Sequence, residues 1–137
     1  MTIDPNNIQR LELVDRLFDD VFSGKKKNTK RYKDKKITEG YLLYEASEDE
    51  KLKALVWVTN VETMPLSQVR EKVEAEKNTS IDDLLRRMRS HYPEISLETK
   101  IEVVMHLSPS ETYIKYGLPN NLLDELGSDY IEKVKAK

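Results

Sequence analysis

The 137-residue chain contains no cysteine, only four glycines and only two histidines. The absence of cysteine excludes disulfides, thiolate zinc sites and cysteine nucleophiles. No GxGxxG, Walker-type or GxSxG motif occurs, so nucleotide-dependent chemistry is disfavoured. His91 and His106 fall in different predicted elements, without a carboxylate at ligand spacing. We therefore assign structural roles to both histidines and expect no metal site.

Long apolar runs are also missing. The longest uninterrupted run, Ala54 to Val58, is far shorter than the ~20 residues that a membrane span needs. The first residues, MTIDPNN, have neither a basic n-region nor an apolar h-region. We therefore expect a cytoplasmic protein without a membrane partner. The chain length and an apolar content of 38% predict one globular domain with a modest core.

The charge is distributed unevenly along the chain. The net charge is −2, but residues 25–36, KKKNTKRYKDKK, hold eight basic residues and one acidic residue. This basic segment therefore carries +7, and the rest of the chain carries −9. Because the segment has almost no apolar residue before Ile37, we expect a surface loop that attracts anions. The simplest alternative is a solvated loop without a ligand.

The apolar patterns predict an α+β fold in which helices flank a small sheet or barrel. A first helix is expected to begin at Asp4-Pro5, to bury a stripe from Ile8 to Phe22, and to end at Gly24. The three predicted strands are Tyr41 to Glu45, Leu55 to Val61 and Ile101 to Leu107. A second helix is predicted at Leu66 to Ala75, and a third is capped by Ser80 and closed by Tyr92-Pro93. Two short helical pieces are predicted after Pro109, at Asn121 to Leu126 and at Ser128 to Ala136.

Several segments together carry a family resemblance. They are Gly24-Lys25-Lys26-Lys27-Asn28-Thr29-Lys30-Arg31, Thr38-Glu39-Gly40, the strand LVWVTNVETMPL and the helix IDDLLRRMRSHYPE. The order of these segments resembles an ASCH domain and, more narrowly, the YqfB-like branch of small bacterial proteins, which are N4-acetylcytidine amidohydrolases with a PUA-like barrel. The resemblance covers about residues 5–107. It implies an ASCH domain over residues 1–108 and a C-terminal helical extension, residues 109–137, packed on the same domain.

The resemblance also implies a catalytic trio. Lys26 and Thr29 occupy the positions of the family's catalytic lysine and threonine. The third member is a glutamate, and an ungapped count back from Tyr92-Pro93 places Lys77 there. One inserted residue restores Glu76, which we choose, with Glu74 as the reserve. The family chemistry requires neither a metal nor an organic cofactor.

This trio makes chemical sense for amide hydrolysis. A threonine hydroxyl needs a nearby base, and a lysine serves when crowding by other cations lowers its pKa. Arg31 and backbone N–H groups would stabilise the oxyanion, and Lys25 is the second basic residue expected to contact substrate. Tyr32, Tyr41 and Trp57 are candidates for stacking on a pyrimidine ring, with core packing as the alternative for Trp57.

Two functions of different classes remain after these considerations. The first is an amidohydrolase that acts on N4-acylated cytosine nucleosides. The second is an RNA-binding module that uses the basic segment, Lys25 to Lys36, without catalysis. Ribonuclease activity ranks third because neither histidine lies near the basic segment in the sequence. The oligomeric state is left open.

Overall fold

Within the residues that the structure describes, the sheet has five strands. The computed structural model describes residues 8–33, 35–73 and 76–135. The strands are β1 (Gln9–Leu13), β2 (Asn28–Arg31), β3 (Gly40–Ala46), β4 (Lys53–Pro65) and β5 (Lys100–His106). Their order in the sheet is β1-β3-β4-β5-β2, with β1 parallel to β3 and all other neighbours antiparallel.

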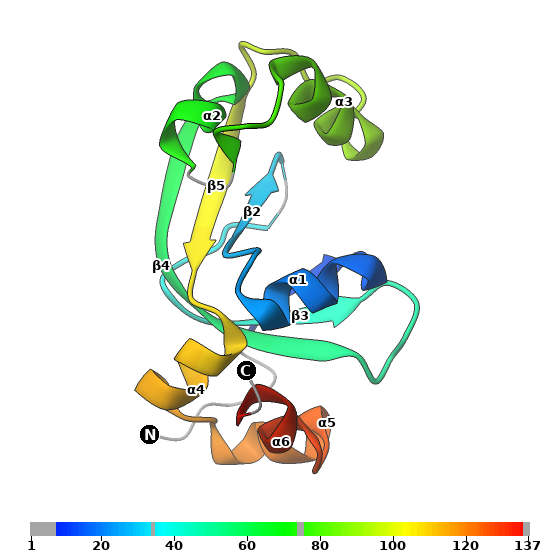
Figure 1. Cartoon of the computed structure of the whole chain (residues 1–137), viewed down its shortest axis with the longest axis vertical. Coiled ribbons are helices and arrows are strands. Elements are labelled where there is room, and N and C mark those ends of the chain that lie inside the picture. The colour runs from blue at the N-terminus through cyan, green and yellow to red at the C-terminus, as the bar shows by residue number, and fades with distance from the viewer. Residues whose placement is uncertain (1–7, 34, 74–75, 136–137) are drawn as a thin grey trace.

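The curvature of the sheet comes from β4. Its first half pairs with β3 and its second half pairs with β5, with a register shift between Val58 and Asn60. A bulge of this kind bends the strand and increases its twist. Figure 1 shows the two halves of β4 running in different directions, so the sheet curls into a half-barrel. The fold is therefore α+β, a curled half-barrel with helices around it.

The helices gather at both ends of the half-barrel (Figure 1). They are α1 (Phe18–Ser23), α2 (Val69–Lys72), α3 (Ile81–His91), α4 (Pro109–Tyr116), α5 (Leu123–Leu126) and α6 (Tyr130–Lys135). In this view α2 and α3 lie at one end, α4 to α6 lie at the other, and α1 lies between them. Within the described ranges, no helix is long and apolar enough to cross a membrane.

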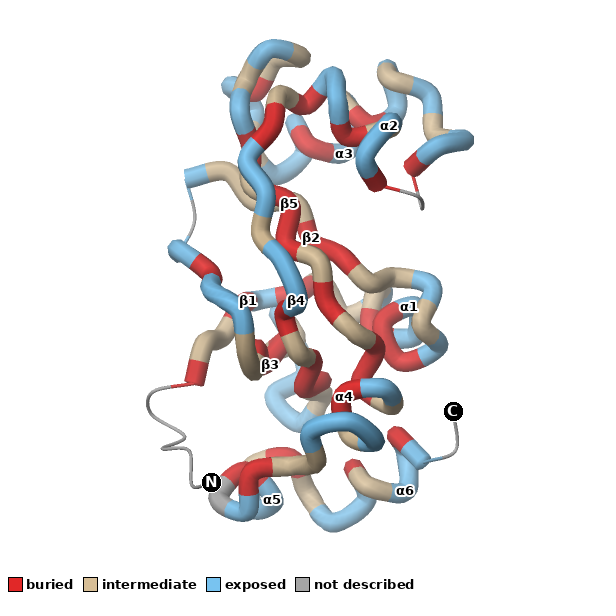
Figure 2. Tube along the Cα trace, turned by 90° about the vertical axis from the view of Figure 1, so that its left-hand side faces the viewer, coloured by how far each residue is buried: buried red, intermediate tan, exposed pale blue. Residues whose placement is uncertain are grey.

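The buried side chains form two clusters rather than one, and Figure 2 shows buried stretches in both halves of the molecule. The larger cluster joins α1, β3 and the first half of β4 to the C-terminal helices, and Phe18, Leu43 and Leu122 belong to it. The smaller cluster joins the end of β4 and β5 to α2 and α3, with Leu66 and Leu84 at 0% and 1% exposure. The two ends of the half-barrel are therefore stabilised separately.

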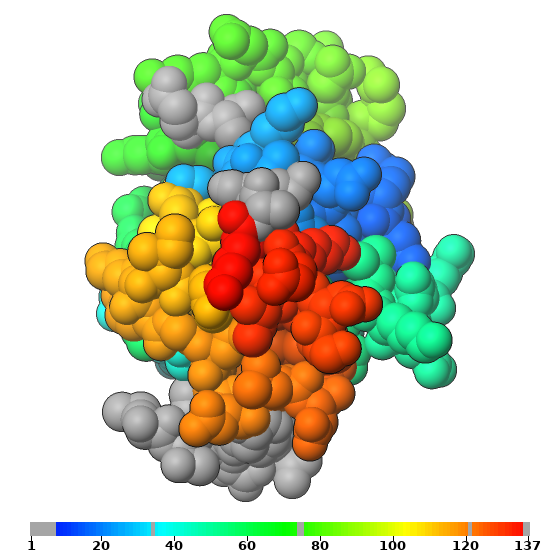
Figure 3. All heavy atoms as spheres, turned by 60° about the horizontal axis from the view of Figure 1, so that its bottom comes forward, coloured from blue at the N-terminus to red at the C-terminus, as the bar shows by residue number. Residues whose placement is uncertain are grey.

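The C-terminal helices are part of the larger cluster. Leu122 and Val134 are fully buried in it. Tyr130 meets the edge of the Phe22 ring at a centroid distance of 6.1 Å, and its hydroxyl accepts a hydrogen bond from the Leu55 N–H at 2.7 Å. Figure 3 shows the C-terminal segment, in orange and red, beside the yellow-orange segment that includes α4. The extension therefore packs on the same body as the sheet, while a boundary at residue 108 stays a prediction.

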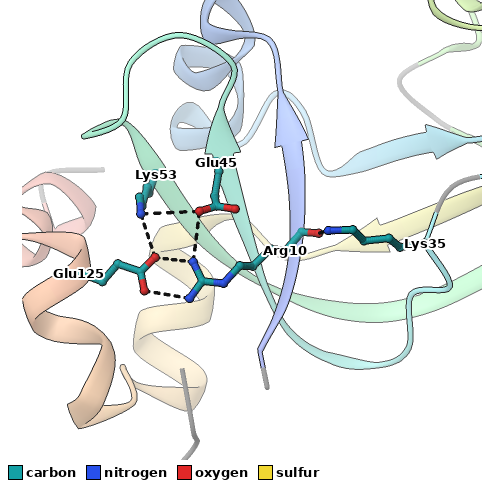
Figure 4. A network of polar contacts seen from close by, with 5 residues as sticks. All are labelled: Arg10, Lys35, Glu45, Lys53 and Glu125. Atoms are coloured by element: carbon teal, nitrogen blue, oxygen red, sulfur yellow. Dashed lines mark hydrogen bonds and ion pairs between the residues drawn. The ribbon is translucent and has the colours of Figure 1, made fainter. Parts of the chain in front are cut away.

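A network of charges also fastens the extension to the sheet (Figure 4). Arg10 of β1 forms a bidentate ion pair with Glu125 of α5, in which Nη1 donates to Oε2 and Nη2 donates to Oε1, the latter at 2.8 Å. Lys53 donates to Glu125 Oε2 at 2.8 Å, and Glu45 lies 3.2 Å from Arg10 Nη1. Hydrogen bonding to Arg10 lowers the pKa of Glu125 to about 2, although partial burial opposes the shift. Glu125 therefore stays ionised down to strongly acidic pH.

Most predicted elements appear in the structure. The strands predicted at Tyr41, Leu55 and Ile101 are β3, β4 and β5. The Ser80 hydroxyl caps α3 by accepting from the Asp83 N–H at 3.1 Å, and α3 ends before Tyr92. The two short C-terminal pieces correspond to a 3-10 turn with α5 and to α6. Gly24 ends α1 with φ 84°, a left-handed conformation that favours glycine.

The prediction of one long first helix is wrong. Residues Gln9–Leu13 form β1, and α1 begins only at Phe18 after a 3-10 turn at Asp15–Leu17. Leu11 and Leu13 are buried on one face with Glu12 exposed between them, which is the alternation of a strand. The parallel pairing with β3 favours this alternation over the helical spacing. The expected start at Asp4-Pro5 lies outside the described residues.

Two other expectations about the chain need correction. The helix expected at Leu66 to Ala75 is a 3-10 turn followed by the four residues of α2, and its expected end at Ala75 lies outside the described residues. The basic segment is not entirely a surface loop, because it contains β2, in which Asn28 and Thr29 are buried. Helix α4 was not among the helical pieces predicted for the C-terminal extension. It begins at Pro109, and Ser108 and Glu111 form a capping box at its start.

The packing of the extension predicts unequal effects for two neighbouring leucines. Leu122→Ala should lower the free energy of unfolding by about 2–5 kcal/mol, because it leaves a cavity in the larger cluster. Leu123 is 36% exposed, so Leu123→Ala should cost far less. Urea unfolding followed by circular dichroism measures both changes. Equal effects would contradict the packing described here.

Candidate functional site

A cleft of about 840 Å³ lies beside the basic segment. One wall comes from β1 and the turn into α1, the second from the basic segment and β2, and the third from α3 with Glu76. The cations that line it outnumber the acids: they are Arg16, Lys25, Lys26, Lys30, Arg31, Lys35 and Arg87, against Glu12, Asp20 and Glu76. The cleft therefore favours an electron-rich ligand.

Lys26 lies in this cleft just after the end of α1. Its backbone N–H donates to the Asp20 carbonyl at 2.9 Å, which fixes the start of the basic segment. Burial lowers the pKa of the Lys26 ammonium to about 7, and repulsion by Lys30 and Arg31 adds to this effect. Within the described ranges, the ammonium makes no hydrogen bond and no ion pair. Near neutral pH this position therefore offers a neutral amine, which can accept a proton.

Thr29 lies on β2, opposite Val104 of β5, and is 4% exposed. Its Oγ1 accepts a hydrogen bond from Arg31 Nε at 3.0 Å. Arg31 Nη2 donates in turn to the Glu12 carbonyl at 3.0 Å, so the guanidinium bridges β2 and β1. The threonine hydroxyl therefore lies at the cleft floor beside a fixed positive charge.

Glu76 is a buried carboxylate whose side chain is 6% exposed. Its Oε1 accepts from Lys30 Nζ at 3.0 Å, and its Oε2 accepts from Arg87 Nη2 at 2.6 Å. Burial alone would raise the pKa of Glu76, but attraction to Lys30 and the hydrogen bonds from Lys30 and Arg87 lower it. The carboxylate is thus held in its charged form between β2 and α3.

The structure brings five of the seven candidate site residues together. Lys25, Lys26, Thr29, Arg31 and Glu76 all line the cleft. Glu76, however, pairs with Lys30 and Arg87 rather than with Lys26.

The two other residues considered for the third position do not join this group. Lys77, given by the ungapped count, is exposed and does not line the cleft. Glu74, the reserve, lies outside the described residues.

The structure does not bring Tyr41 and Trp57 into the cleft. The Trp57 ring stacks on Tyr116 with centroids 3.7 Å apart and planes at 10°, and Tyr41 meets it edge-on at 5.0 Å. The backbone N–H of Trp57 donates a hydrogen bond to Thr112 Oγ1 of α4 at 3.0 Å. These aromatic rings therefore anchor α4. We no longer consider them as ring contacts of this cleft.

Other cleft residues were not singled out from the sequence. Arg87 gave no signal beyond its place in a basic helix, and Lys30 was considered only as one of several crowding cations. Tyr92 lines the cleft and meets the Tyr32 ring edge-on at 5.9 Å. Within the described part of the chain, no group of three or more His, Asp or Glu residues is placed to hold a metal ion.

The comparisons with known proteins concern the fold. No family model and no curated protein matches the chain. Three solved structures of the ASCH protein from Zymomonas mobilis do match. The unmutated form has a TM-score of 0.53 at 12% identity, over 93% of this chain and 92% of that chain. Two mutant forms have TM-scores of 0.55 and 0.54, also at 12% identity and 93% of this chain, with 95% and 93% of those chains covered. The chain has the fold of an ASCH domain.

The cleft geometry predicts a special sensitivity at Glu76. Glu76→Gln should lower the free energy of unfolding by about 3 kcal/mol, because Lys30 then loses its counter-ion in a buried position. The same substitution should lower the pKa of Lys26 further, since the charge of Glu76 opposes the effect of burial on it. Urea unfolding and NMR titration of the lysine side chain measure the two effects.

Asp83→Asn is the matched control. Asp83 pairs with Arg86 on the exposed side of α3, where both side chains are more than half exposed. Its neutralisation should change the free energy of unfolding by no more than about 0.5 kcal/mol. A Lys26 pKa that is unaffected by Glu76→Gln would contradict the electrostatic description of the cleft.

Proposed function

We propose that this protein hydrolyses the amide bond of N4-acylated cytosine nucleosides. The observation that carries the proposal is the pairing of a lysine, whose pKa burial lowers to about 7, with a buried threonine in one cleft. The resemblance of residues 24–31 to the loop of the amidohydrolases supports the same assignment.

The reaction begins with a proton transfer. Neutral Lys26 takes the hydroxyl proton of Thr29 while Oγ1 forms a bond to the carbonyl carbon of the substrate. The tetrahedral adduct then breaks its C–N bond, and the ammonium of Lys26 returns the proton to the departing N4 amine. A water molecule hydrolyses the acyl-threonine ester in the same way, with Lys26 again as the base.

The surrounding charges support each of these steps. Arg31 lies against Thr29 Oγ1, so its positive charge stabilises the developing alkoxide and oxyanion. Glu76 compensates Lys30 and Arg87, which keeps these cations from lowering the pKa of Lys26 still further. Tyr92 is the tyrosine of the cleft wall and takes the stacking role first considered for Tyr41 and Trp57.

The assay for this function is release of cytidine from N4-acetylcytidine, followed by chromatography. Thr29→Ala and Lys26→Ala should each reduce release to the uncatalysed background, because one removes the nucleophile and the other the base. Thr63→Ala and Lys51→Ala change the same residue types at exposed positions away from the cleft and should keep full activity. Activity retained in Thr29→Ala would refute the proposal.

The pH dependence provides a second test of Lys26. Because the amine must be neutral to act as a base, kcat/KM should fall about tenfold per pH unit below pH 7 and level off above it. Glu76→Gln should move the midpoint to lower pH, since the charge of Glu76 raises the pKa of Lys26. Asp83→Asn should leave the midpoint unchanged. A profile without a midpoint near pH 7 would remove Lys26 as the base.

RNA binding without catalysis is the second candidate, and the cationic lining of the cleft favours it. Contacts between phosphates and residues such as Arg16, Lys25 and Lys35 would make RNA affinity fall steeply with salt. Hydrolysis of an uncharged nucleoside would depend only weakly on salt. Thr29→Ala would abolish hydrolysis but would leave RNA affinity nearly unchanged, so one variant separates the two functions.

A further inference from the structure

One buried polar side chain of the cleft, Asn28, has no part in the mechanism above. It lies on β2, is 4% exposed and lines the cleft. Its Oδ1 accepts a hydrogen bond from Lys30 Nζ at 3.1 Å, and the same ammonium donates to Glu76 Oε1 at 3.0 Å. A side-chain amide also carries an NH2 group with two donors. The two N–H groups of Asn28 therefore need acceptors of their own.

Lys30 fixes the orientation of the Asn28 amide. An ammonium group has only donors, so the amide atom that faces Lys30 Nζ must be the oxygen. A rotated amide would place its NH2 group against the cation and would lose this hydrogen bond. The Lys30 side chain is itself only 9% exposed and is held by Glu76. The NH2 group of Asn28 is therefore directed away from Lys30.

The NH2 group of Asn28 has no acceptor within the described part of the chain. Among the fully enclosed side-chain nitrogen and oxygen atoms of the described residues, only Arg70 Nε lacks a hydrogen-bond partner. Asn28 Nδ2 is therefore not fully enclosed, and its open side is the cleft that Asn28 lines. Because an unsatisfied donor is costly, its acceptor has to come from the contents of the cleft, either water or a ligand.

Asn28 and Thr29 point to opposite faces of β2, because side chains alternate along a strand. The hydrogen bonds agree with this alternation, since Asn28 pairs with Lys30 and Thr29 pairs with Arg31. In the proposed reaction the scissile carbonyl lies at Thr29 and Arg31. The Asn28 amide therefore meets a different part of the substrate.

The face of β2 that carries Asn28 turns toward the proposed stacking residue. Tyr32 follows Asn28 and Lys30 at the same alternate spacing, and its ring meets Tyr92 edge-on at 5.9 Å. Tyr92 lies at the end of α3 and lines the cleft. A pyrimidine ring stacked on Tyr92 therefore lies on the Asn28 side of the cleft, with its polar edge within the region that the Asn28 NH2 group faces.

We propose that Asn28 recognises the pyrimidine ring of the substrate by donating a hydrogen bond to its O2 carbonyl oxygen. This inference rests on the proposed function, because it takes the substrate to be an N4-acylated cytosine. The edge of the cytosine ring beside N4 carries two acceptors, N3 and O2. A donor directed at O2 selects a base with a carbonyl at this position. An acylated adenine has a C–H group there and is disfavoured.

Exchange of one atom in the substrate tests this contact. N4-acetyl-2-thiocytidine has sulfur in place of O2, and sulfur is a weak hydrogen-bond acceptor. The wild type should hydrolyse N4-acetylcytidine with a kcat/KM about tenfold higher than that of the thio compound. Asn28→Leu has a similar size but no donor, so the two substrates should react with nearly equal kcat/KM. An unchanged preference in Asn28→Leu would overturn the proposal.

Asn60→Leu is the matched control. Asn60 is exposed on β4, its Nδ2 donates to Glu62 Oε1 at 2.9 Å, and it does not line the cleft. This substitution should leave the preference for the oxygen compound unchanged. The preference is a ratio of two substrates within one variant, so a change in the folded fraction or in the pKa of Lys26 cancels. A wild type that shows no preference would also overturn the proposal.

Binding of the reaction product separates this inference from the proposed function. Cytidine has the same O2 and requires no turnover, so the NH2 resonances of Asn28 report the contact by NMR whether or not the protein is catalytic. We expect cytidine to shift these resonances, 2-thiocytidine to shift them less, and those of Asn60 to stay in place. An inactive protein with this response would refute the proposed function and retain Asn28 as the donor. Unmoved Asn28 resonances would overturn the inference, even in a protein that hydrolyses N4-acetylcytidine.

Discussion

The ion pair between Lys30 and Glu76 is the interaction on which the site depends. A strongly basic segment enters the sheet as β2, so at least one of its cations must be buried, and an uncompensated buried cation is costly. Glu76, in the connection between α2 and α3, compensates the charge of Lys30. Arg87 of α3 forms a second ion pair with the same carboxylate. The same carboxylate is not bonded to Lys26. Lys26 is therefore left as the cation whose proton is easily lost.

The shape of the sheet determines where this chemistry takes place. The register shift in β4 turns the strand from β3 to β5, and each half of the curved sheet has its own buried cluster. The cleft lies where β1 and α1, on one cluster, face α3, on the other. Residues from the two separately packed ends therefore contribute to one site.

The sequence predicted the elements whose signals are local. The strands β3, β4 and β5, the Ser80 cap of α3 and the Gly24 stop depend on residues close together in the chain. In contrast, β1 could not be recognised, because its parallel partner β3 lies about thirty residues away and its leucines also fit a helical stripe. Helix α4 was missed because the helical pieces predicted after Pro109 begin only at Asn121, whereas Ser108 and Glu111 cap a helix that begins at Pro109 itself.

The same distinction applies to the candidate site. The resemblance of residues 24–31 implied that Lys26, Thr29 and Arg31 are site residues, and all three line one cleft because they belong to a single continuous segment. The ionic partners of Glu76 depend on contacts between segments that lie apart in the sequence, β2 and α3. Trp57 was a plausible stacking residue by type alone, but its place on β4 turns it toward α4.

The stacking of Trp57 on Tyr116 has a practical consequence for optical studies. Trp57 is the single tryptophan of the chain, and its ring lies on α4 rather than in the cleft. Intrinsic tryptophan emission therefore reports whether α4 is docked on the half-barrel. It does not report the entry of a nucleoside into the cleft. A spectroscopist would need a probe at another position to follow ligand binding.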